Sequence, residues 1–398
     1  MQNPPPLPPK YDPNDPEAIR DPYRVYAQLR RAGRLCRGGP GQWFVTRYDD
    51  VAALLREQSF DHRIIERYQR FSPEEPVTGF FQSIIFERDP PQHDRLRKMF
   101  VTAFDASHPS RLRSKIGALV DELLEPALER RYFDAVSDFA ALLPGRVVGE
   151  LLGIPRADLA EVEARARRLS RAFDMRHPPN QDREGANEAV AWLRAYVGAL
   201  AKILEAKAGE DVLSRMLRVE GVTRSEVVDN AIFLFFSGLE TTRDLVATGC
   251  AALLSFPDEA MRLRRDPSLA APAVEEFLRY DAPIQALARL VREPIAVGSR
   301  MLRTGRVVML LIGSANHDEQ RFASPERLDI GRRPNPHLSF GGGLYHCLGA
   351  TVARTSAATA FATLLAKTAQ FEAAGEAVRP PSAMFRSYSK IPVALTPN

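Results

Sequence analysis

The chain has 398 residues, of which 45% are hydrophobic and 26% charged, as in an ordinary globular protein. Its formal net charge of +4 is small for this length and no block of like charges occurs, so the composition argues against nucleic acid as a partner. Three widely spaced cysteines argue against a disulfide framework. The proline-rich start lacks the apolar core of a signal peptide. No apolar run is long enough to cross a membrane. We therefore expect a cytoplasmic protein that binds neither nucleic acid nor a membrane.

The first half of the chain is predicted to be mainly helical. Residues 1–20 indicate an extended arm, and the lack of a long linker after it predicts a single domain over residues 21–398. Asp21 and Pro22 form a helix-start signal. Helical spacing then predicts helices over residues 23–32, 49–55, 92–104, 110–127, 138–152, 157–173 and 184–208, with a strand at 42–46.

Two stretches between these helices carry functional expectations. Residues 64–89 hold many apolar side chains without a clear period, which indicates either a loop folded over an apolar molecule or a hydrophobic loop packed on its own domain. Residues 174–180 are polar and separate two long helices, so we expect a movable junction there. Residues 80–85 and 174–180 are therefore candidate lids over a binding site.

The stretch from Val222 to Ser255 predicts one helix about twice the ordinary length. Thr223 and Glu226 match a capping box at its start, and the segment 231–236 is apolar nearly all round, so the helix should be central and buried. The run Ser237-Gly238-Leu239-Glu240-Thr241-Thr242 then places an acid and hydroxyls inside it, which is costly unless they are satisfied or used. Either a satisfied polar patch between helices or a bulge at the glycine that admits a small ligand would explain this run.

The region after this helix is expected to supply an ion pair and short strands. Glu276 and Arg279 lie three residues apart on one helical face, which permits an ion pair. Strands are predicted at 286–291, 295–297 and 307–311, and a polar loop region leads from them to residue 340. A last hairpin is predicted from residues 383–388 and 391–395.

Cys347 follows the glycines at 341–343 and precedes a predicted helix over 348–367. A sulfur at a helix N-terminus is close to free N–H groups and to the positive end of the helix dipole, which favour the thiolate. Glycines without Cβ atoms let the loop approach a flat ligand, and Phe340 would add an apolar wall. Such a thiolate suits one soft metal centre, because the four close ligands of a zinc site are absent; the alternative is a small buried hydrophobe in an ordinary turn.

Four motifs, in this order along the chain, together resemble the cytochrome P-450 family of haem-thiolate monooxygenases, in its soluble bacterial form. They are His93-x-x-x-Arg97, Ser237-Gly238-Leu239-Glu240-Thr241, Glu276-x-x-Arg279 and Phe340-x-x-Gly343-x-x-x-Cys347-x-Gly349. The resemblance covers nearly the whole chain. It implies a mainly α fold with small β-sheets, as a triangular, helix-rich single domain whose long central helix lies over the haem.

The resemblance also implies a role for each motif. Haem b would be held by the axial thiolate of Cys347, and O2 would be the co-substrate. Glu240 and Thr241 would relay protons on the distal side. The remaining residues would be structural or hold the cofactor: Glu276, Arg279 and Arg332 in a network behind the haem, His93, Arg97 and Arg289 on the propionates, and Phe340, Gly343 and Gly349 in the haem-binding loop.

Tyr345 departs from this pattern. Two residues before the cysteine the family commonly has His or Arg for a propionate, and this chain has a phenol. A phenol can donate one hydrogen bond but carries no charge. We expect Tyr345 to contact a propionate weakly and the haem to be retained, because three basic partners remain.

The resemblance implies a substrate pocket and an electron donor. The donor would be a ferredoxin or flavodoxin-type protein with its reductase, docking near Arg97, Lys98 and Arg354, and the chain would act as a monomer. Aromatic lining indicates a medium-sized apolar or aromatic small molecule. The pocket residues expected from their positions are Phe80, Phe81, Ile84, Phe233, Phe236, Ser237, Gln285, Leu287, Phe385 and Tyr388.

The expected reaction is insertion of one oxygen atom from O2 into the substrate, as a hydroxylation or epoxidation in secondary metabolism or catabolism. Oxidative coupling or desaturation of a biosynthetic intermediate, in some cases bound to a carrier, would use the same motifs. A non-catalytic haem-thiolate sensor is the alternative from another class, and it would not need an acid–alcohol pair. Direct use of peroxide is disfavoured because Glu240 and Thr241 supply a proton relay.

Overall fold

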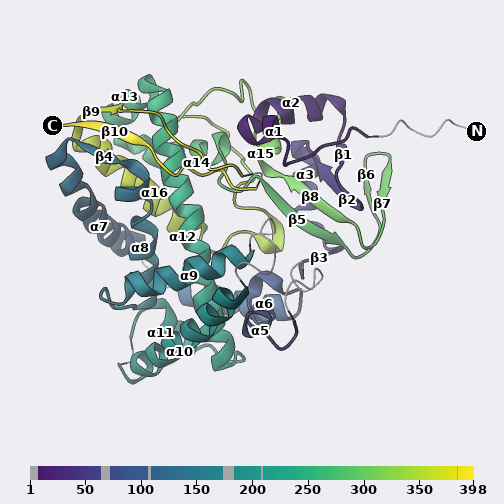
Figure 1. Cartoon of the computed structure of the whole chain (residues 1–398), viewed down its shortest axis with the longest axis horizontal. Helices are drawn as coiled ribbons and strands as arrows, with labels where there is room; N and C mark the ends of the chain where they lie inside the picture. Colours follow the sequence, from purple (N-terminus) through teal and green to yellow (C-terminus); the bar gives the residue numbers. More distant parts are fainter. Residues whose placement is uncertain (1–7, 64–71, 106–108, 174–182, 208, 383) are drawn as a thin grey trace, which may run out of the picture.

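The computed structural model describes residues 8–63, 72–105, 109–173, 183–207, 209–382 and 384–398. Within these ranges the helices form a broad body, and most strands gather at one side of it (Figure 1). The fold class predicted from sequence, mainly α with small sheets, is confirmed. The helices are α1 (Pro16–Arg20), α2 (Pro22–Ala32), α3 (Tyr48–Leu54), α5 (Pro76–Phe81), α6 (Gln92–Asp105), α7 (Pro109–Arg130), α8 (Leu143–Leu152), α9 (Leu159–Phe173), α10 (Arg183–Lys207), α11 (Val212–Leu217), α12 (Arg224–Ser255), α13 (Pro257–Arg265), α14 (Ala270–Tyr280), α15 (Ile312–Ala315) and α16 (Ala350–Ala366).

The strands form three sheets. The largest has the order β1-β2-β8-β5-β3, a second has the order β4-β10-β9, and β6 pairs with β7. The strands are β1 (Leu35–Arg37), β2 (Gln42–Val45), β3 (Phe60–Asp61), β4 (Tyr132–Asp134), β5 (Ala286–Val291), β6 (Ile295–Val297), β7 (Arg300–Leu302), β8 (Val307–Leu311), β9 (Thr368–Ala373) and β10 (Pro392–Pro397). The predicted strands at 286–291, 295–297 and 307–311 are confirmed residue for residue.

Helix α12 is the centre of the helical body. Thr223 caps it, with the side chain accepting from the Glu226 backbone N–H and the Glu226 side chain returning the bond, as the capping box predicts. Its first half packs with α9 and α10 and its second half with α14 and α16, and α8 also contacts it. A Cβ at Gly249 would lie 2.3 Å from Phe361, so this position lets α12 and α16 approach closely.

The predicted bulge in this helix does not occur. The α-helical assignment is continuous from Arg224 to Ser255. A Cβ at Gly238 would lie 3.1 Å from Val148 Cγ2. Gly238 therefore permits close packing of α12 on α8. This contact, and not a local widening of the helix, explains why a glycine occupies the position.

Several boundaries differ from the sequence prediction. The extended arm does not reach residue 20, because Asp15 caps the short helix α1 through the backbone N–H groups of Glu17 and Ala18. Residues 76–81 form helix α5 within the stretch predicted to be a loop. The predicted helix at 138–152 is divided into a π-helical turn, Ala135–Ala140, and α8, which begins next to Pro144. That a single domain extends over residues 21–398 stays a prediction.

The predicted C-terminal hairpin is wrong. Strand β10 pairs with β9 and β4, whereas residues 384–388 form no strand and Phe385 only bridges to Ile284. The pairing with β9 keeps Leu395 opposite Phe371, so both apolar side chains enter the core. Local alternation marked the strand but could not identify its distant partner.

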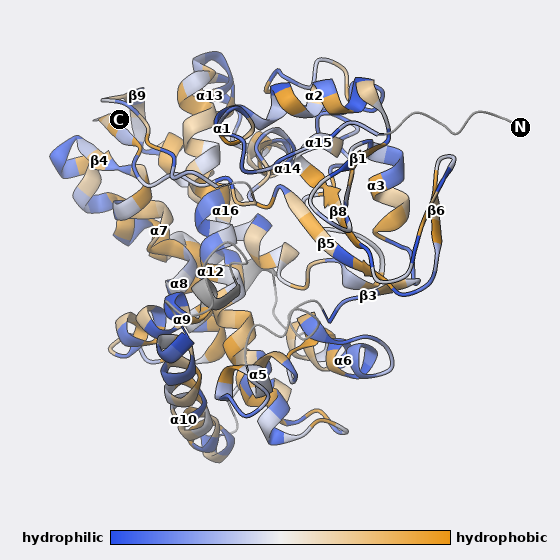
Figure 2. Cartoon of the chain, turned by 45° about the vertical axis from the view of Figure 1, so that its right-hand side comes forward, coloured by the Kyte–Doolittle hydropathy of each residue, from blue (hydrophilic) through white to orange (hydrophobic). Residues whose placement is uncertain are grey.

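Hydrophobic residues, coloured orange, are frequent on strands β5 and β8 and on the parts of the helices that face one another (Figure 2). Among the described residues no helix is long and apolar enough to cross a membrane. Long helices such as α2 and α9 carry a polar face toward solvent, as surface helices do.

Candidate active site

The loop before Cys347 is tightly folded. The Gly341 N–H donates to Leu338 O at 2.9 Å, and the Cys347 N–H donates to Phe340 O at 3.0 Å. Gly343 has a φ of +63°, and a Cβ there would lie 3.0 Å from the backbone of Leu55 and Arg56. Only glycine meets both demands, so this residue type fixes how the loop packs against the end of α3.

Cys347 lies just before α16, but its thiol is not activated in the way the sequence predicts. The N–H groups of Gly349 and Ala350 do lower the pKa of the thiol, yet burial has the larger effect and raises the pKa overall. The side chain is nevertheless accessible. The exposed sulfur can therefore be reached by a metal ion, and a bound metal ion would remove its proton.

Helix α6 and strand β5 bring basic side chains to this loop. Arg97 on α6 donates from Nη1 to His346 O at 3.1 Å. The His93 ring lies 4.4 Å from the ring of Tyr345, and the Arg289 guanidinium carbon lies 5.9 Å from that ring. Burial lowers the pKa of His93 and lowers that of Arg289 to about 10. The structure therefore gathers the predicted propionate partners at one place.

The Tyr345 hydroxyl does not point to an empty site. It donates to Asp89 Oδ1 at 2.9 Å and lies 3.3 Å from Arg88 O, and burial together with Asp89 raises its pKa. The expectation that this hydroxyl donates to a propionate is therefore wrong for this arrangement. The Tyr345 ring also stacks on His62, a residue that sequence reasoning missed because nothing local connects positions 62 and 345.

Glu240 and Thr241 lie at the middle of α12. The Thr241 hydroxyl donates to Ser237 O at 2.9 Å, as a threonine inside a helix often does, and Ser237 Oγ lies 3.3 Å from Leu234 O. Both Glu240 and Thr241 are half-buried. No described residue forms a hydrogen bond or an ion pair with the Glu240 carboxyl, so this acid is available for chemistry.

Glu276 and Arg279 on α14 form the predicted ion pair. Their side chains are 0% exposed and meet through two contacts of 2.7 Å. Arg279 also donates to Asn316 O, Pro325 O and Arg327 O, while Arg332 Nε donates to Glu276 at 3.1 Å. This network fastens the long loop between α15 and the cysteine to the helical body, which matches the structural role expected for it.

The structure divides the predicted pocket residues into two groups. Phe233, Ser237, Leu287, Phe385 and Tyr388 keep accessible surface, whereas Phe236 is 6% exposed. Phe80, Phe81 and Ile84 have 0–2% exposure in the core beside α12, so they offer no surface to a ligand and their assignment to the pocket, and to a lid, is wrong.

Gln285 is also misassigned. It is 1% exposed, and its amide donates to Ala282 O at 2.7 Å and to the Tyr23 hydroxyl at 3.2 Å. These bonds hold it inside the protein. Phe86, which the sequence analysis did not single out by itself, is 48% exposed, and its ring lies 6.0 Å from that of Phe233. The second predicted lid, 174–180, lies outside the described residues.

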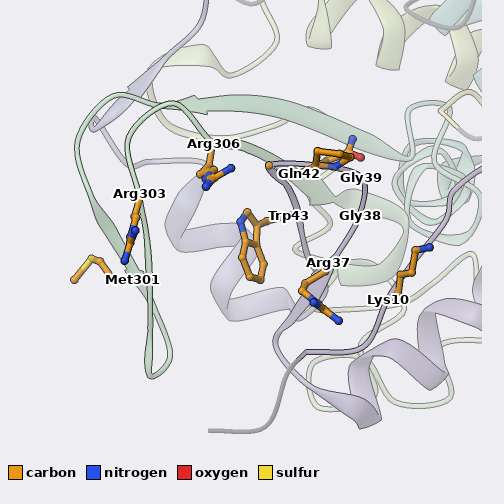
Figure 3. A pocket seen from close by; sticks show the side chains of 11 residues that line it. Lys10, Arg37, Gly38, Gly39, Gln42, Trp43, Met301, Arg303 and Arg306 are labelled. Carbon is orange, nitrogen blue, oxygen red and sulfur yellow. The ribbon is translucent and has the colours of Figure 1, made fainter. Parts of the chain in front are cut away.

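A pocket on the protein surface shares no residue with this site (Figure 3). Backbone of the turn between β1 and β2 lines it together with Trp43, and four cations, Lys10, Arg37, Arg303 and Arg306, surround it. It contains none of the four motifs, so the chemistry is assigned to the Cys347 site.

Comparisons with known proteins agree with the fold and with this site. A family model described as Cytochrome P-450 matches residues 200–384. The biotin biosynthesis cytochrome P-450 of Bacillus subtilis is 33% identical, over 88% of this chain and 89% of that protein. The cytochrome P-450 monooxygenase PikC of Streptomyces venezuelae is 32% identical, over 94% and 91%.

Two solved structures extend the likeness to three dimensions. The crystal structure of CalO2 has a TM-score of 0.92 and 34% identity, covering 98% of this chain and 99% of that one. P-450 BioI, crystallised with an acyl carrier protein ligated to hexadec-9Z-enoic acid, has a TM-score of 0.90 and 30% identity, covering 95% and 100%.

Fold and site together define a haem-thiolate oxygenase. The chain belongs to the cytochrome P-450 family and is a monooxygenase that uses haem, O2, a small-molecule substrate and a redox partner. The residues present fit the cofactor. The Cys347 thiol is accessible, Arg97, His93 and Arg289 lie near its loop, and the buried Nε2 atom of His62 has no hydrogen-bond partner among the described residues.

Proposed function

We propose that this monooxygenase hydroxylates or epoxidises a medium-sized apolar or aromatic molecule, with Glu240 and Thr241 controlling proton delivery. The observation that carries the proposal is an unpaired acid next to a hydroxyl in the middle of a buried helix. The Glu240 carboxyl is half-buried and forms no hydrogen bond or ion pair with a described residue, so it is free to take up and release a proton beside the Thr241 hydroxyl. A spectral titration of the purified protein with terpenes, steroids, macrolides, fatty acids and phenolics tests the substrate class; binding confined to strongly polar molecules would contradict it.

Cys347 would hold the haem iron through its thiolate, and Arg97, His93 and Arg289 would hold the propionates. Haem supplies, when bound, the binding and reductive activation of O2. Cys347 would hold the haem iron, and Glu240 and Thr241 of α12 would supply the proton-transfer groups. The neutral hydroxyl of Thr241 donates to Ser237 O at rest and can rotate to donate elsewhere, and Glu240 can replace the proton that the hydroxyl gives up.

Aromatic side chains support an apolar substrate. Phe233 is half-buried on α12, with Phe236 at 5.4 Å and Phe86 at 6.0 Å between ring centroids. Phe86 keeps 48% of its surface, which is unusual for a large aromatic side chain. Leu287 and Phe385 add half-buried apolar surface. Coupling or desaturation of a carrier-bound intermediate remains the second candidate, because the BioI structure was crystallised with an acylated carrier protein.

Thr241→Ala is expected to uncouple electron consumption from product formation. Without the hydroxyl, proton delivery is less controlled, and more of the electrons end in hydrogen peroxide. General acid–base groups contribute roughly 10²–10⁴-fold, and water can replace part of this, so we expect product per electron to fall about tenfold. Parallel measurement of cofactor oxidation, peroxide and product checks this ratio.

Thr248→Ala is the matched control for that variant. The Thr248 hydroxyl donates to Asp244 O at 2.8 Å, the same bond to the carbonyl four residues back, on the same helix. Thr248→Ala therefore removes an equivalent hydrogen bond at a position that is not next to Glu240. Equal coupling in Thr241→Ala and in the control would contradict the proton-delivery role.

The electron donor is proposed to be an acidic ferredoxin or flavodoxin-type protein that docks beside Cys347. Arg354 is a weaker candidate for this surface than predicted, because it is engaged by Glu275 at 2.7 and 2.9 Å. Lys98 is exposed and has no ion-pair partner among the described residues, and Arg56 is exposed next to Gly343. All three cysteines are free, which supports function in a reducing cytoplasm, and we propose a monomer.

Lys98→Glu is expected to slow electron transfer from an acidic donor without changing haem content. Rim charges act mainly on the association rate, so we expect a drop of about tenfold at low salt that shrinks as salt is added. Stopped-flow reduction measures this rate. Lys390→Glu, a charge reversal at another exposed lysine, should leave it unchanged; similar slowing in both variants would mean that docking does not involve Lys98.

A further inference from the structure

A buried histidine beside Tyr345 has a ring nitrogen without a partner. His62 directly follows β3, and the β3–β5 register, with Phe60 opposite Val291 and Asp61 opposite Leu290, brings it level with Arg289. Its side chain is 8% exposed. Nδ1 lies 3.0 Å from Asp89 Oδ1, whereas Nε2 is buried and has no hydrogen-bond partner among the residues that the structure describes. Buried polar atoms are rarely left unpaired, so Nε2 indicates a missing ligand.

Asp89 and Tyr345 fix the orientation of this ring. Asp89 receives the Nδ1 contact of His62 at 3.0 Å and the Tyr345 hydroxyl at 2.9 Å. Although burial would raise the pKa of Asp89, these two contacts hold it far below its usual range. The Tyr345 ring stacks on His62 with a centroid separation of 3.4 Å and an interplanar angle of 21°. The stacking fixes the ring plane, and the Asp89 contact fixes which nitrogen remains free.

The surroundings of the free nitrogen are electropositive. Arg289 and His93 both act on His62, and with burial, the largest effect, they lower its pKa to about 4 against the opposing effect of Asp89. Asp89 is the acid in contact with the ring, and its oxygens already accept from His62 and Tyr345. The cluster therefore sets three basic side chains, His62, His93 and Arg289, against Asp89 as the acid in contact with the His62 ring. A carboxylate matches this chemistry.

We infer that His62 binds a haem propionate through Nε2, with Asp89 and Tyr345 as positioning residues. The inference rests on the proposed placement of the haem on Cys347. Because Nδ1–H donates to Asp89, Nε2 donates to a carboxylate only as imidazolium, so His62 gains a proton together with the propionate. Tyr345 thus acts through His62 and does not itself contact the propionate.

The test compares His62→Leu, which keeps most of the volume without a polar atom, with His62→Gln, which keeps an N–H donor at the end of the side chain. Transfer of haem from each holoenzyme to excess apomyoglobin gives the release rate, and a redox titration gives the midpoint potential. We expect His62→Leu to release haem about tenfold faster or more, and His62→Gln within about threefold of the unchanged protein, because bonds to charged groups are strong. The potential of His62→Leu should fall, since the propionate charge is then less compensated.

His317→Leu controls for the loss of a buried imidazole elsewhere. His317 Nε2 lies 2.8 Å from Tyr280 O, and we expect this variant to alter neither release rate nor potential. Equal release rate and potential in His62→Leu and the unchanged protein would overturn the inference, as would release from His62→Gln as fast as from His62→Leu. If the protein without any substitution were found to lack thiolate-ligated haem, that result would instead overturn the proposed function.

Discussion

Cys347→Ser is expected to abolish both the thiolate-type Soret absorption and product formation. A serine hydroxyl stays protonated at neutral pH and is a poor ligand for a soft metal centre, whereas a cysteine bound to a metal loses its proton outright. Donation of electron density by the thiolate favours O–O cleavage, so turnover should be lost even if some haem stays bound. Absorption spectra and product analysis of the purified variant check both effects.

The other cysteines provide the control. Cys36 and Cys250 are 0% exposed within hydrophobic clusters, so neither sulfur can be reached by a metal centre, whereas Cys347 is exposed. Cys36→Ala should therefore keep the Soret band. If Cys347→Ser kept the unchanged spectrum and turnover, the assignment of the axial ligand would be wrong.

Arg279→Ala is expected to cause the largest loss of stability of any single substitution considered for this chain. It would leave the Glu276 carboxylate buried at 0% exposure, with only Arg332, Asn335 and the Asp329 N–H to bind it. Removing one partner of a buried ion pair costs about 3–5 kcal/mol. Soluble yield and urea unfolding of the haem-loaded protein measure the loss.

Arg224→Ala is the comparison for that variant. Arg224 and Glu205 also meet at 2.7 Å, but their side chains are 43% and 44% exposed. Exposed ion pairs contribute about 0–1 kcal/mol, so this variant should unfold near the urea concentration of the unchanged protein. Similar losses in the two variants would show that burial does not set the strength of the Glu276–Arg279 pair. Arg279→Lys should fall between them, because lysine keeps the charge but not the two parallel bonds.

Local patterns predicted most of the long helices and the ion pair on α14. The capping box at Thr223 located the start of α12, since it depends only on neighbouring residues. The spacing of Glu276 and Arg279 located an ion pair on one helical face. Phe80 and Ile84 were misjudged as pocket residues, because an apolar stretch without a period looks the same whether it lines a cavity or fills a core.

Contacts between distant segments could not be predicted in the same way. The pairing of β10 with β9 and β4 depends on which strands the helices bring together, so the expected hairpin was wrong. The cysteine illustrates a competition between effects: the helix N–H groups lower the pKa of its thiol as predicted, but burial outweighs them. Burial is a property of the packed molecule and is not written in the local sequence.

The sequence by itself determined the mainly helical fold, the long central helix, the cysteine loop and the acid–alcohol pair, because each is set by residues close together in the chain. Tertiary structure alone decided that the Tyr345 hydroxyl donates a hydrogen bond to Asp89. It also decided that His62 lies level with Arg289 through the β3–β5 register and that its Nε2 atom has no partner among the described residues. Those groups come from positions 62, 89, 289 and 345. Only packing of strand, loop and helix places them within hydrogen-bonding and stacking distance of one another.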